Sequence, residues 1–224
     1  PKNKRTYDES WFAPRDPGLG TVLVMLGVEG EIPELAHHNF LFSDDWSDDF
    51  NAVFNGPVAS RPQAASQSIY VSKPSATDPS VAPAGHENLF VLVPVPADPS
   101  VGHGDMYRGE ASEQVQRIAE AAIEQIAARC GVAGLGRRIV VKQTLGPADF
   151  AERYNAWSGG SIGPAHTLRH SAFLRGTNKS RKLDTLMYAG ATTTPGVGVP
   201  MCLISAENVL KRVRGDRSSG PLDH

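Results

Sequence analysis

Apolar residues in the first two thirds of the chain recur with the spacing that strands require. Residues 21–27 (TVLVMLG) are continuously apolar, which is typical of a strand covered on both faces. Shorter apolar runs predict four further strands, at residues 38–42, 68–72, 87–94 and 138–144. Pro94 and Pro96 indicate that one of these strands ends at a sheet edge or lies along it.

A longer apolar repeat predicts helices between these strands. The clearest one begins after Ser112, a possible N-cap, and extends to Cys130, with Gly131 as its stop. Pro147 begins a shorter helix that ends near Tyr154. Strands that alternate with helices without regular βαβ spacing predict an α+β fold, built on a mixed sheet with packing helices.

Four carboxylates crowd residues 43–50 (SDDWSDDF). They fit the acidic first turn of a helix that carries Phe50, Val53 and Phe54. A cation site is the alternative, although the spacing is not that of a calcium-binding loop. The sequence favours the helix start.

The end of the chain combines an apolar run, a glycine-rich loop and a helix. Residues 183–189 predict a buried strand that ends at Gly190. Apolar residues then recur at helical spacing after Pro200, whose missing N–H suits a first turn, and Gly215 is a plausible stop. The predicted order is therefore strand, loop, helix.

The start of this last helix lacks a residue that could cap it. Gly198 and Val199 offer no cap, so unless residues 192–194 fold back, free N–H groups and the positive end of the helix dipole face a ligand. A phosphate or a partly negative ring oxygen suits such a position. Glycines at 190, 196 and 198 would let a ligand approach the backbone. The same pattern also fits a glycine-rich turn before an ordinary buried helix.

Five stretches of the sequence together carry a family resemblance. They are LAHHNFLF (35–42), YVSKPSATDPSVAPAG (70–85), LFVLVPVP (89–96), WSGGSIG (157–163) and YAGATTTPGVGVPMCLISA (188–206). In this order they resemble bacterial phytoene desaturases, the carotenoid dehydrogenases among the amine-oxidase-like flavoproteins. The resemblance spans the chain from about residue 22 to residue 215.

The resemblance implies a cofactor, FAD, and a division of the chain. Residues 1–180 would be most of a substrate-binding domain, 181–215 the strand, loop and helix that contact FAD, and 216–224 a tail. The residues implied to contact FAD are Gly190, Ala191, Pro195, Gly196, Val197, Gly198, Val199 and Pro200. The sequence contains no Gly-x-Gly-x-x-Gly fingerprint. We therefore expect a C-terminal fragment whose N-terminal Rossmann portion is absent and which is inactive on its own.

The implied activity is the introduction of double bonds into a carotenoid precursor, from phytoene towards lycopene. Such a hydrocarbon has no polar group to polarise, so the resemblance predicts no catalytic acid or base, and the flavin would accept the hydride. A related desaturase or a redox-neutral isomerase that acts on another polyene is an alternative. A non-catalytic folded, binding or dimerising module is a second alternative.

Composition adds limits on partners and location. The 224 residues are 40% hydrophobic with a net charge of −2, which gives no reason to expect nucleic acid as a partner. Cys130 and Cys202 do not make a disulfide framework, so a cytoplasmic protein is the simpler prediction. No apolar run is long enough for a membrane span. The resemblance implies peripheral contact with a membrane, because a carotenoid hydrocarbon resides in lipid. The basic end of the last helix, residues 211–214, is a secondary candidate for contact with anionic lipid.

Three other patterns suggest chemistry and are judged weaker. Residues 159–163 match the Gly-x-Ser-x-Gly elbow of hydrolases around Ser161, but a helix rather than a strand is predicted before them. The elbow also needs an acid and then a histidine later in the chain, and after Asp184 the only histidine is His224. His37 and His38 should point to opposite faces of a strand. His166 and His170 could pair on a helix but have no flanking ligands, so no metal site is predicted.

Overall fold

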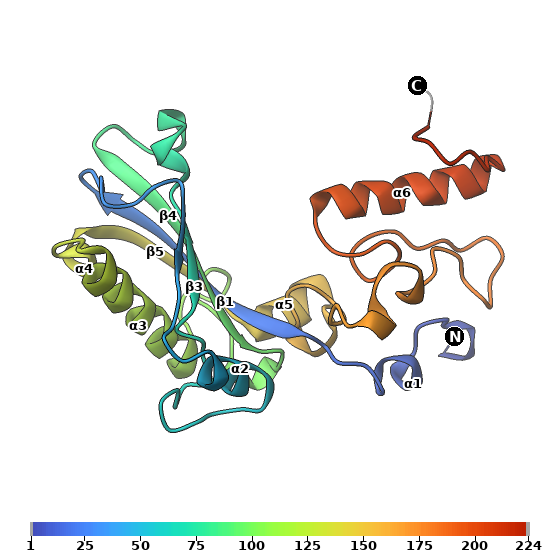
Figure 1. The fold of residues 1–224 in the computed structure, drawn as a ribbon, viewed down its shortest axis with the longest axis horizontal. Coiled ribbons are helices and arrows are strands. Elements are labelled where there is room, and N and C mark those ends of the chain that lie inside the picture. Colours follow the sequence, from blue (N-terminus) through green and yellow to red (C-terminus); the bar gives the residue numbers. More distant parts are fainter. Residues whose placement is uncertain (1, 223–224) are drawn as a thin grey trace. The chain divides into compact units, whose positions relative to one another are not determined.

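The computed structural model describes residues 2–222, and the chain forms two compact units (Figure 1). The larger one, the sheet unit, comprises Leu19–Ser161. The smaller one, the loop-helix unit, combines Pro1–Gly18 with Ile162–His224. Pro1, Asp223 and His224 lie outside the described residues, so the end of the predicted tail does as well.

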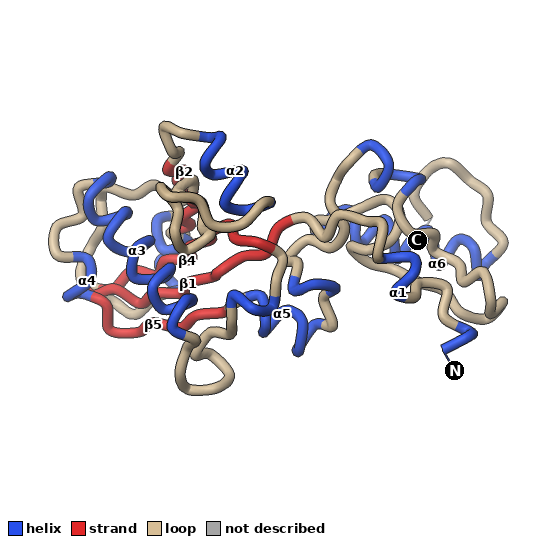
Figure 2. Tube along the Cα trace, turned by 90° about the horizontal axis from the view of Figure 1, so that it is seen from below, coloured by secondary structure: helices blue, strands red, loops and turns tan. Residues whose placement is uncertain are grey.

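Five antiparallel strands form the sheet, in the order β2-β3-β4-β1-β5. They are β1 (Leu19–Glu29), β2 (His38–Leu41), β3 (Ile69–Ser72), β4 (His86–Pro96) and β5 (Ile139–Leu145). All five predicted strands and the α+β class are confirmed. The prediction of a mixed sheet is wrong, because each pair of neighbouring strands is antiparallel (strands are red in Figure 2).

Three helices of the sheet unit begin and end close to the predicted residues, and a fourth, α4 (Leu135–Arg138), was not predicted. The three are α2 (Trp46–Phe54), α3 (Glu113–Cys130) and α5 (Pro147–Tyr154). Gly131 ends α3 in the left-handed conformation, with φ 73°. Ser112 occupies the N-cap position, but its hydroxyl accepts the His103 N–H instead of capping the helix.

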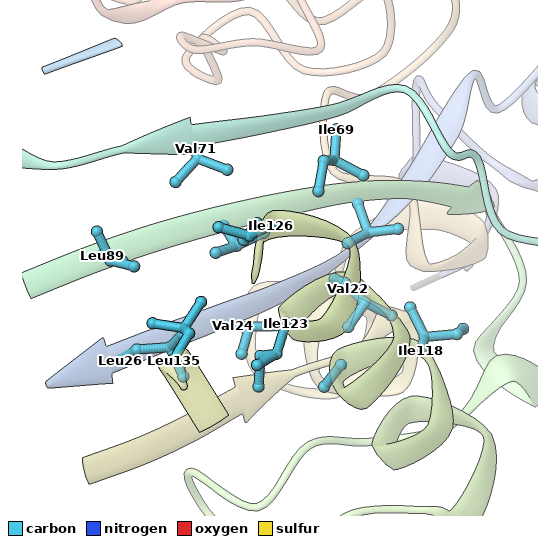
Figure 3. Packing of buried hydrophobic residues seen from close by; sticks show 14 of the residues in the cluster. Val22, Val24, Leu26, Ile69, Val71, Leu89, Ile118, Ile123, Ile126 and Leu135 are labelled. Atoms are coloured by element: carbon cyan, nitrogen blue, oxygen red, sulfur yellow. The ribbon is translucent and has the colours of Figure 1, made fainter. Parts of the chain in front are cut away.

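Alternation along β1 places one row of side chains against α3. Val22, Val24 and Leu26 are buried and point towards the same side as the isoleucines of α3 (Figure 3). The intervening Leu23 and Met25 are only half-buried. The prediction that this strand is covered on both faces is therefore confirmed for one face only, and we call the other face, away from α3, the open face.

The two prolines of β4 do not mark a sheet edge. β4 has neighbours on both sides, so the prediction of an edge position is wrong. Pro96 is the last residue of the strand, two residues beyond the predicted end at Pro94. The carbonyl of Pro94 accepts the Ser66 N–H, outside the residues that pair with β3. A proline is tolerated there because no β3 carbonyl needs its N–H.

The α-helices of the loop-helix unit are α1 (Glu9–Phe12), in its N-terminal segment, and α6 (Val199–Arg214), in its C-terminal segment. Residues 162–180, expected to belong to the substrate domain, lie in this compact unit. No described helix of either unit is long and apolar enough to cross a membrane.

The strand predicted at residues 183–189 does not form. The segment makes one isolated bridge, between Lys179 and Met187. Two backbone hydrogen bonds connect it to the facing segment. The Ser180 N–H donates to the Leu186 carbonyl, and the Tyr188 N–H donates to the Asn178 carbonyl. An apolar run becomes a strand only where a neighbour offers a ladder of such bonds, and here the partner is too short.

A buried ion pair fixes α2 to the loop that follows it. Asp49 Oδ1 lies 2.9 Å from Arg61 Nε, and both side chains are buried. Asp49 also accepts the Ser68 hydroxyl and the Gln67 N–H, and the guanidinium donates to the Ser43 hydroxyl. The predicted acidic helix start is thus confirmed, with Asp45 as N-cap and Asp49 as the anchor of α2.

Acid should weaken this anchor. Burial alone would raise the pKa of Asp49, but hydrogen bonds from Ser68, Gln67 and Arg61 outweigh it and hold the pKa below its ordinary value. Because the pKa of Asp49 is lower in the folded than in the unfolded state, this carboxylate stabilises the fold at pH values above the unfolded pKa, about 3.9. That stabilisation is lost as the pH falls through the lower pKa of the folded state.

We expect Asp49→Asn to lower the free energy of unfolding by about 3 kcal/mol at pH 7, because Arg61 is left buried without its charge partner. The variant should also lose part of the wild-type pH dependence below about pH 4. Urea unfolding from pH 7 down to about pH 3 measures both effects. Asp44→Asn, at an exposed neighbouring position, is the control, and equal losses in the two variants would contradict the anchor.

Candidate functional site

The glycine-rich loop leads into α6 as the sequence predicts. Gly198 is the N-cap, with φ 106° and ψ 151°, Pro200 lies in the first turn, and no described side chain caps the helix. The hydroxyls of Thr193 and Thr194 donate to the carbonyls of Gly190 and Gly176 instead of folding back. The uncapped helix start is therefore confirmed, since neither of these hydroxyls caps the helix.

Two glycines of the loop have both a special backbone and open space. Gly190 has φ 114° and Gly198 has φ 106°, a region that L side chains rarely adopt. A Cβ built at either position would meet no described atom within 4 Å. Backbone shape thus requires glycine at both places, and the open side leaves room for a ligand beside the main chain.

The apolar residues of α6 are mostly uncovered. Ser205 is the one buried residue among the described positions of this helix. Val199 is 76% exposed and Leu203 67% exposed. The alternative prediction of an ordinary buried helix is therefore wrong for this chain. The basic residues of the last turn, in contrast, lie where the helix dipole favours cations, as predicted.

A cluster of buried polar groups holds the loop against the middle of α6. Asn178 Nδ2 lies 3.0 Å from Ser205 Oγ and 3.1 Å from the carbonyl oxygens of Tyr188 and Thr194. Ser205 Oγ in turn accepts the Gly190 N–H at 3.1 Å. We call these residues, with Thr193, the Asn178 cluster. It connects both ends of the glycine-rich loop to one point on the helix.

Sequence reasoning missed this cluster. The charged sequence of residues 178–182 (NKSRK) is typical of a solvated loop. Lys179, Arg181 and Lys182 are indeed exposed, but Asn178 and Ser180 are buried. An asparagine among charged residues gives no signal of burial, because the acceptors that satisfy it come from distant carbonyls.

Arg175 is a second anchor that the sequence did not reveal. Its side chain is buried, and its guanidinium donates to the carbonyls of Ala191 at 2.7 Å, Pro164 at 2.8 Å, His170 at 3.1 Å and Ile162 at 3.2 Å. Burial lowers the pKa of Arg175. These carbonyl dipoles replace the water that the cation gives up, so Arg175 fixes Ala191, a predicted cofactor contact, relative to residues 162–170.

The open face of the sheet is the second candidate surface. Directly opposed residues of antiparallel strands point to the same face. The strand registers therefore align one apolar row across all five strands on this face: Leu145, Leu23, Leu92, Tyr70 and Phe40. Leu145 is buried, the middle residues are half-buried, and Phe40 is exposed. The row offers a continuous apolar surface without a charged side chain.

A cavity of about 530 Å³ lies beside this row. Met25, Gly27, Phe90 and Val141 of the sheet line it, together with the loop residues Val81 and Pro83. Its walls are mainly apolar side chains, which is typical of sites for apolar small molecules.

The weaker sequence candidates find structural roles. A turn of 3-10 helix, Trp157–Gly159, precedes Ser161 in place of a strand, and the Ser161 hydroxyl donates to the Leu19 carbonyl. The hydrolase elbow therefore lacks its required context. No group of three or more metal-ligating side chains occurs within residues 2–222.

The histidine pairs differ from expectation. The rings of His37 and His38 lie 4.2 Å apart, so the prediction of opposite faces is wrong, because β2 begins only at His38. His37 Nδ1 is hydrogen-bonded to the Thr77 hydroxyl, and His38 Nδ1 is hydrogen-bonded to the Tyr70 hydroxyl. Desolvation by burial lowers the pKa of both His166 and His170.

Comparison with known proteins relates the whole chain to one class of oxidoreductases, the carotenoid desaturases. The chain is 40% identical over 216 residues to a carotenoid 3,4-desaturase of Haloarcula japonica, an alignment that covers 96% of this chain and 41% of the relative. It is 31% identical over 217 residues to 4,4'-diapophytoene desaturases (4,4'-diaponeurosporene-forming) of Staphylococcus aureus strains RF122 and MSSA476, covering 96% of the chain and 42% of each relative. Over 96% of its length the chain is therefore similar to the C-terminal two fifths of carotenoid desaturases.

The alignments also show how much of each relative the chain covers. It spans about two fifths of the length of the curated proteins that it matches. The sequence matches no protein-family model.

We expect Asn178→Ala to lower the free energy of unfolding by about 2 kcal/mol, because Ser205 and the loop carbonyls lose a buried donor. Asn178→Asp should cost at least as much, since a carboxylate keeps the shape but cannot donate. Denaturant unfolding, with hydrogen exchange at the Gly190 amide as the local probe, measures the effect. Asn208→Ala on α6 should change stability by less than about 0.5 kcal/mol, and a comparable loss there would argue against the cluster.

Proposed function

We propose that the chain is the C-terminal portion of a FAD-dependent, phytoene desaturase-like oxidoreductase that introduces double bonds into a carotenoid precursor. The sheet unit would bind the substrate, and the loop-helix unit would contact FAD. The sequence relation to carotenoid desaturases over 96% of the chain carries the proposal. The absent N-terminal part of the same protein would supply the Rossmann portion of the cofactor site, so the isolated chain should be inactive.

The start of α6 fits a flavin nucleotide in three respects. Its first turn has no side-chain cap, and Gly190 and Gly198 leave space beside the main chain. Arg175 and Asn178 hold the connecting loop in one shape. When bound, FAD would accept the hydride that leaves the substrate. The N–H groups at Val199 and Met201 would then stabilise negative charge on the ring, by about 1 kcal/mol from the helix dipole alone.

The open face of the sheet fits a substrate without polar groups. The apolar row across its strands ends at Phe40, and the neighbouring cavity has apolar walls. A hydrocarbon polyene can be held only by shape and by burial of apolar area, so no acid or base is required on this surface. Its role would be to orient the polyene and to keep water from the reacting carbon.

Peripheral contact with a cytoplasmic membrane surface completes the proposal, because such a hydrocarbon resides in lipid. Lys211, Arg212 and Arg214 at the end of α6 are candidates for contact with anionic head groups. Each such cation near the surface contributes about 1 kcal/mol.

A related desaturase or isomerase that acts on another polyene is the second candidate, and the names of the relatives favour it, since they specify two different reactions. Product analysis with the full-length protein, supplied with phytoene and with a C30 analogue, separates these activities. If the full-length protein changed neither compound, a non-catalytic role for this chain would replace the proposal.

Gly198→Val tests the cofactor contact. In the full-length protein we expect bound flavin to fall by about tenfold or more, because a branched side chain would occupy the space beside the first turn of α6. Flavin absorbance per mole of purified protein is the measurement. Gly215→Val, which strains a positive-φ glycine at the other end of the same helix, should keep its flavin. Unchanged flavin in Gly198→Val would refute the assigned contact.

A further inference from the structure

Six aromatic rings, all exposed except the half-buried Tyr70, form a continuous line on the sheet unit. Neighbouring ring centroids are 5.1 Å apart for Tyr70 and Phe40, 5.9 Å for Phe40 and Phe42, and 5.4 Å for Phe42 and Trp46. Along α2 the line continues in steps of 6.2 Å, from Trp46 to Phe50 and from Phe50 to Phe54. We call these residues the aromatic stripe: Tyr70, Phe40, Phe42, Trp46, Phe50 and Phe54.

The stripe is not part of the hydrophobic core. Phe40 is 63% exposed, Phe42 52% and Phe50 56%, whereas the buried side of α2 is formed by Asp49, Ala52 and Val53. The positions i, i+4 and i+8 put Trp46, Phe50 and Phe54 on one face of the helix. Leaving large rings in water costs stability, so a line of them at regular spacing requires a partner.

The anchor beneath α2 holds this line in place. Asp49 and Arg61 fix the buried side of the helix to the following loop. On the stripe itself, the Tyr70 hydroxyl is already bonded to His38 Nδ1 at 2.7 Å. That hydroxyl is the one polar group on the phenylalanine and tyrosine rings of the stripe, so those rings present aromatic surface and no unsatisfied hydroxyl.

The charges beside the stripe do not suit an anionic membrane. Asp44 and Asp45 are exposed next to Trp46, and Asp48 follows on the helix. No lysine or arginine occurs between residues 35 and 60. Arg129 is a nearby cation, but its guanidinium donates to the Phe42 carbonyl. Interfacial helices that bind bilayers carry basic residues on their polar face, and α2 carries acidic ones.

The width of the stripe does not suit a protein partner. On the solvent side of the rings the helix presents Ser47 and Asn51, which are exposed and polar. A stable protein interface needs a broad apolar centre within a polar rim. A line one ring wide fits a long, narrow apolar molecule instead.

The stripe is also continuous with the open face of the sheet. Phe40 and Tyr70 are opposed in the β2 and β3 register, and Tyr70 is opposed to Leu92 of β4. These residues belong both to the stripe and to the apolar row described above. A chain-like molecule can therefore leave the sheet face over Tyr70 and Phe40 and continue along α2 without crossing a charged side chain.

We propose that the aromatic stripe binds a linear isoprenoid polyene lengthwise and passes it to and from the open face of the sheet. The proposal rests on the proposed function for its substrate class. The isoprene repeat, with one methyl branch per unit, is of the same order as the ring spacing, so methyl groups can seat between successive rings. Stacking against ring faces requires no hydrogen bond from the ligand, as a hydrocarbon demands.

Tryptophan fluorescence of the 224-residue chain tests the stripe. The chain has three tryptophans, and Trp11→Phe with Trp157→Phe leaves Trp46 as the donor. The probe is methyl trans-parinarate, a linear conjugated tetraene that absorbs tryptophan emission. Saturable energy transfer from Trp46 is expected. Phe42→Ser and Phe50→Ser should each weaken binding by about fivefold through lost apolar contact.

Controls separate the stripe from general stickiness and from the proposed function. Tyr154→Ser removes an exposed ring outside the stripe and should bind the tetraene as the parent does. The midpoints of thermal unfolding should agree among these variants, because all the replaced rings are exposed. Unchanged affinity in Phe42→Ser and Phe50→Ser, or no transfer to the tetraene at all, would overturn the stripe while leaving desaturation by the full-length protein to be judged from its products.

Flotation with phosphatidylcholine vesicles, with and without phosphatidylglycerol, distinguishes a bilayer from a single polyene. We expect the stripe variants and the parent to float equally. If Phe42→Ser and Phe50→Ser lost vesicle binding but kept tetraene binding, the stripe would be a membrane contact and the polyene proposal would be wrong.

Discussion

The alternation of side chains along β1 is the constraint on which the sheet unit depends. β1 pairs with β4 and β5 on its two sides, so its residues must point alternately to the two faces. Val22 and Val24 meet α3, and Leu23 and Met25 necessarily face the other way. Antiparallel sheets with one solvated face usually alternate apolar and polar residues. Here the second face is apolar too, which suits a surface that meets an apolar molecule or chain rather than water.

The loop-helix unit is organised by a different interaction. Its long helix buries one residue, Ser205, and the loop before it is held by hydrogen bonds from Asn178 and Arg175 to main-chain carbonyls. Such bonds fix backbone shape without filling the space beside it. They keep the main chain near Gly190 and Gly198 ordered and leave open space beside it, which suits a ligand that approaches the backbone closely.

Periodic elements were predictable because each follows from a local repeat. All five strands and the helices at 46–54, 113–130, 147–154 and 199–214 were expected close to their observed bounds. The antiparallel pairing of the sheet and the absence of a strand at 183–189 were not predicted, because both depend on which segment pairs with which. The uncapped helix start at Gly198 could be predicted from residue types. The buried roles of Asn178 and Arg175 could not, because their hydrogen-bond partners are mainly carbonyls elsewhere in the chain. The aromatic stripe was equally hidden: Phe40, Phe42 and Phe50 are visible in the sequence, but their alignment requires the turn from β2 into α2.

The proposed polyene substrate would restrict where the chain and its relatives can differ in substrate choice. A hydrocarbon offers no charge or hydrogen bond, so discrimination must come from apolar shape, where each methylene in a pocket is worth about 1 to 3 kcal/mol. The related desaturases named above act on different carotenoid compounds, although they share 31 to 40% of residues with this chain. The backbone site before α6 gives no such discrimination, because its N–H groups are the same for any sequence that folds this way. Under the proposed function, differences in polyene choice would therefore depend on the side chains of the sheet's apolar row, such as Leu23, Leu92 and Tyr70. Their size can change while the strand register and the covered face stay as they are.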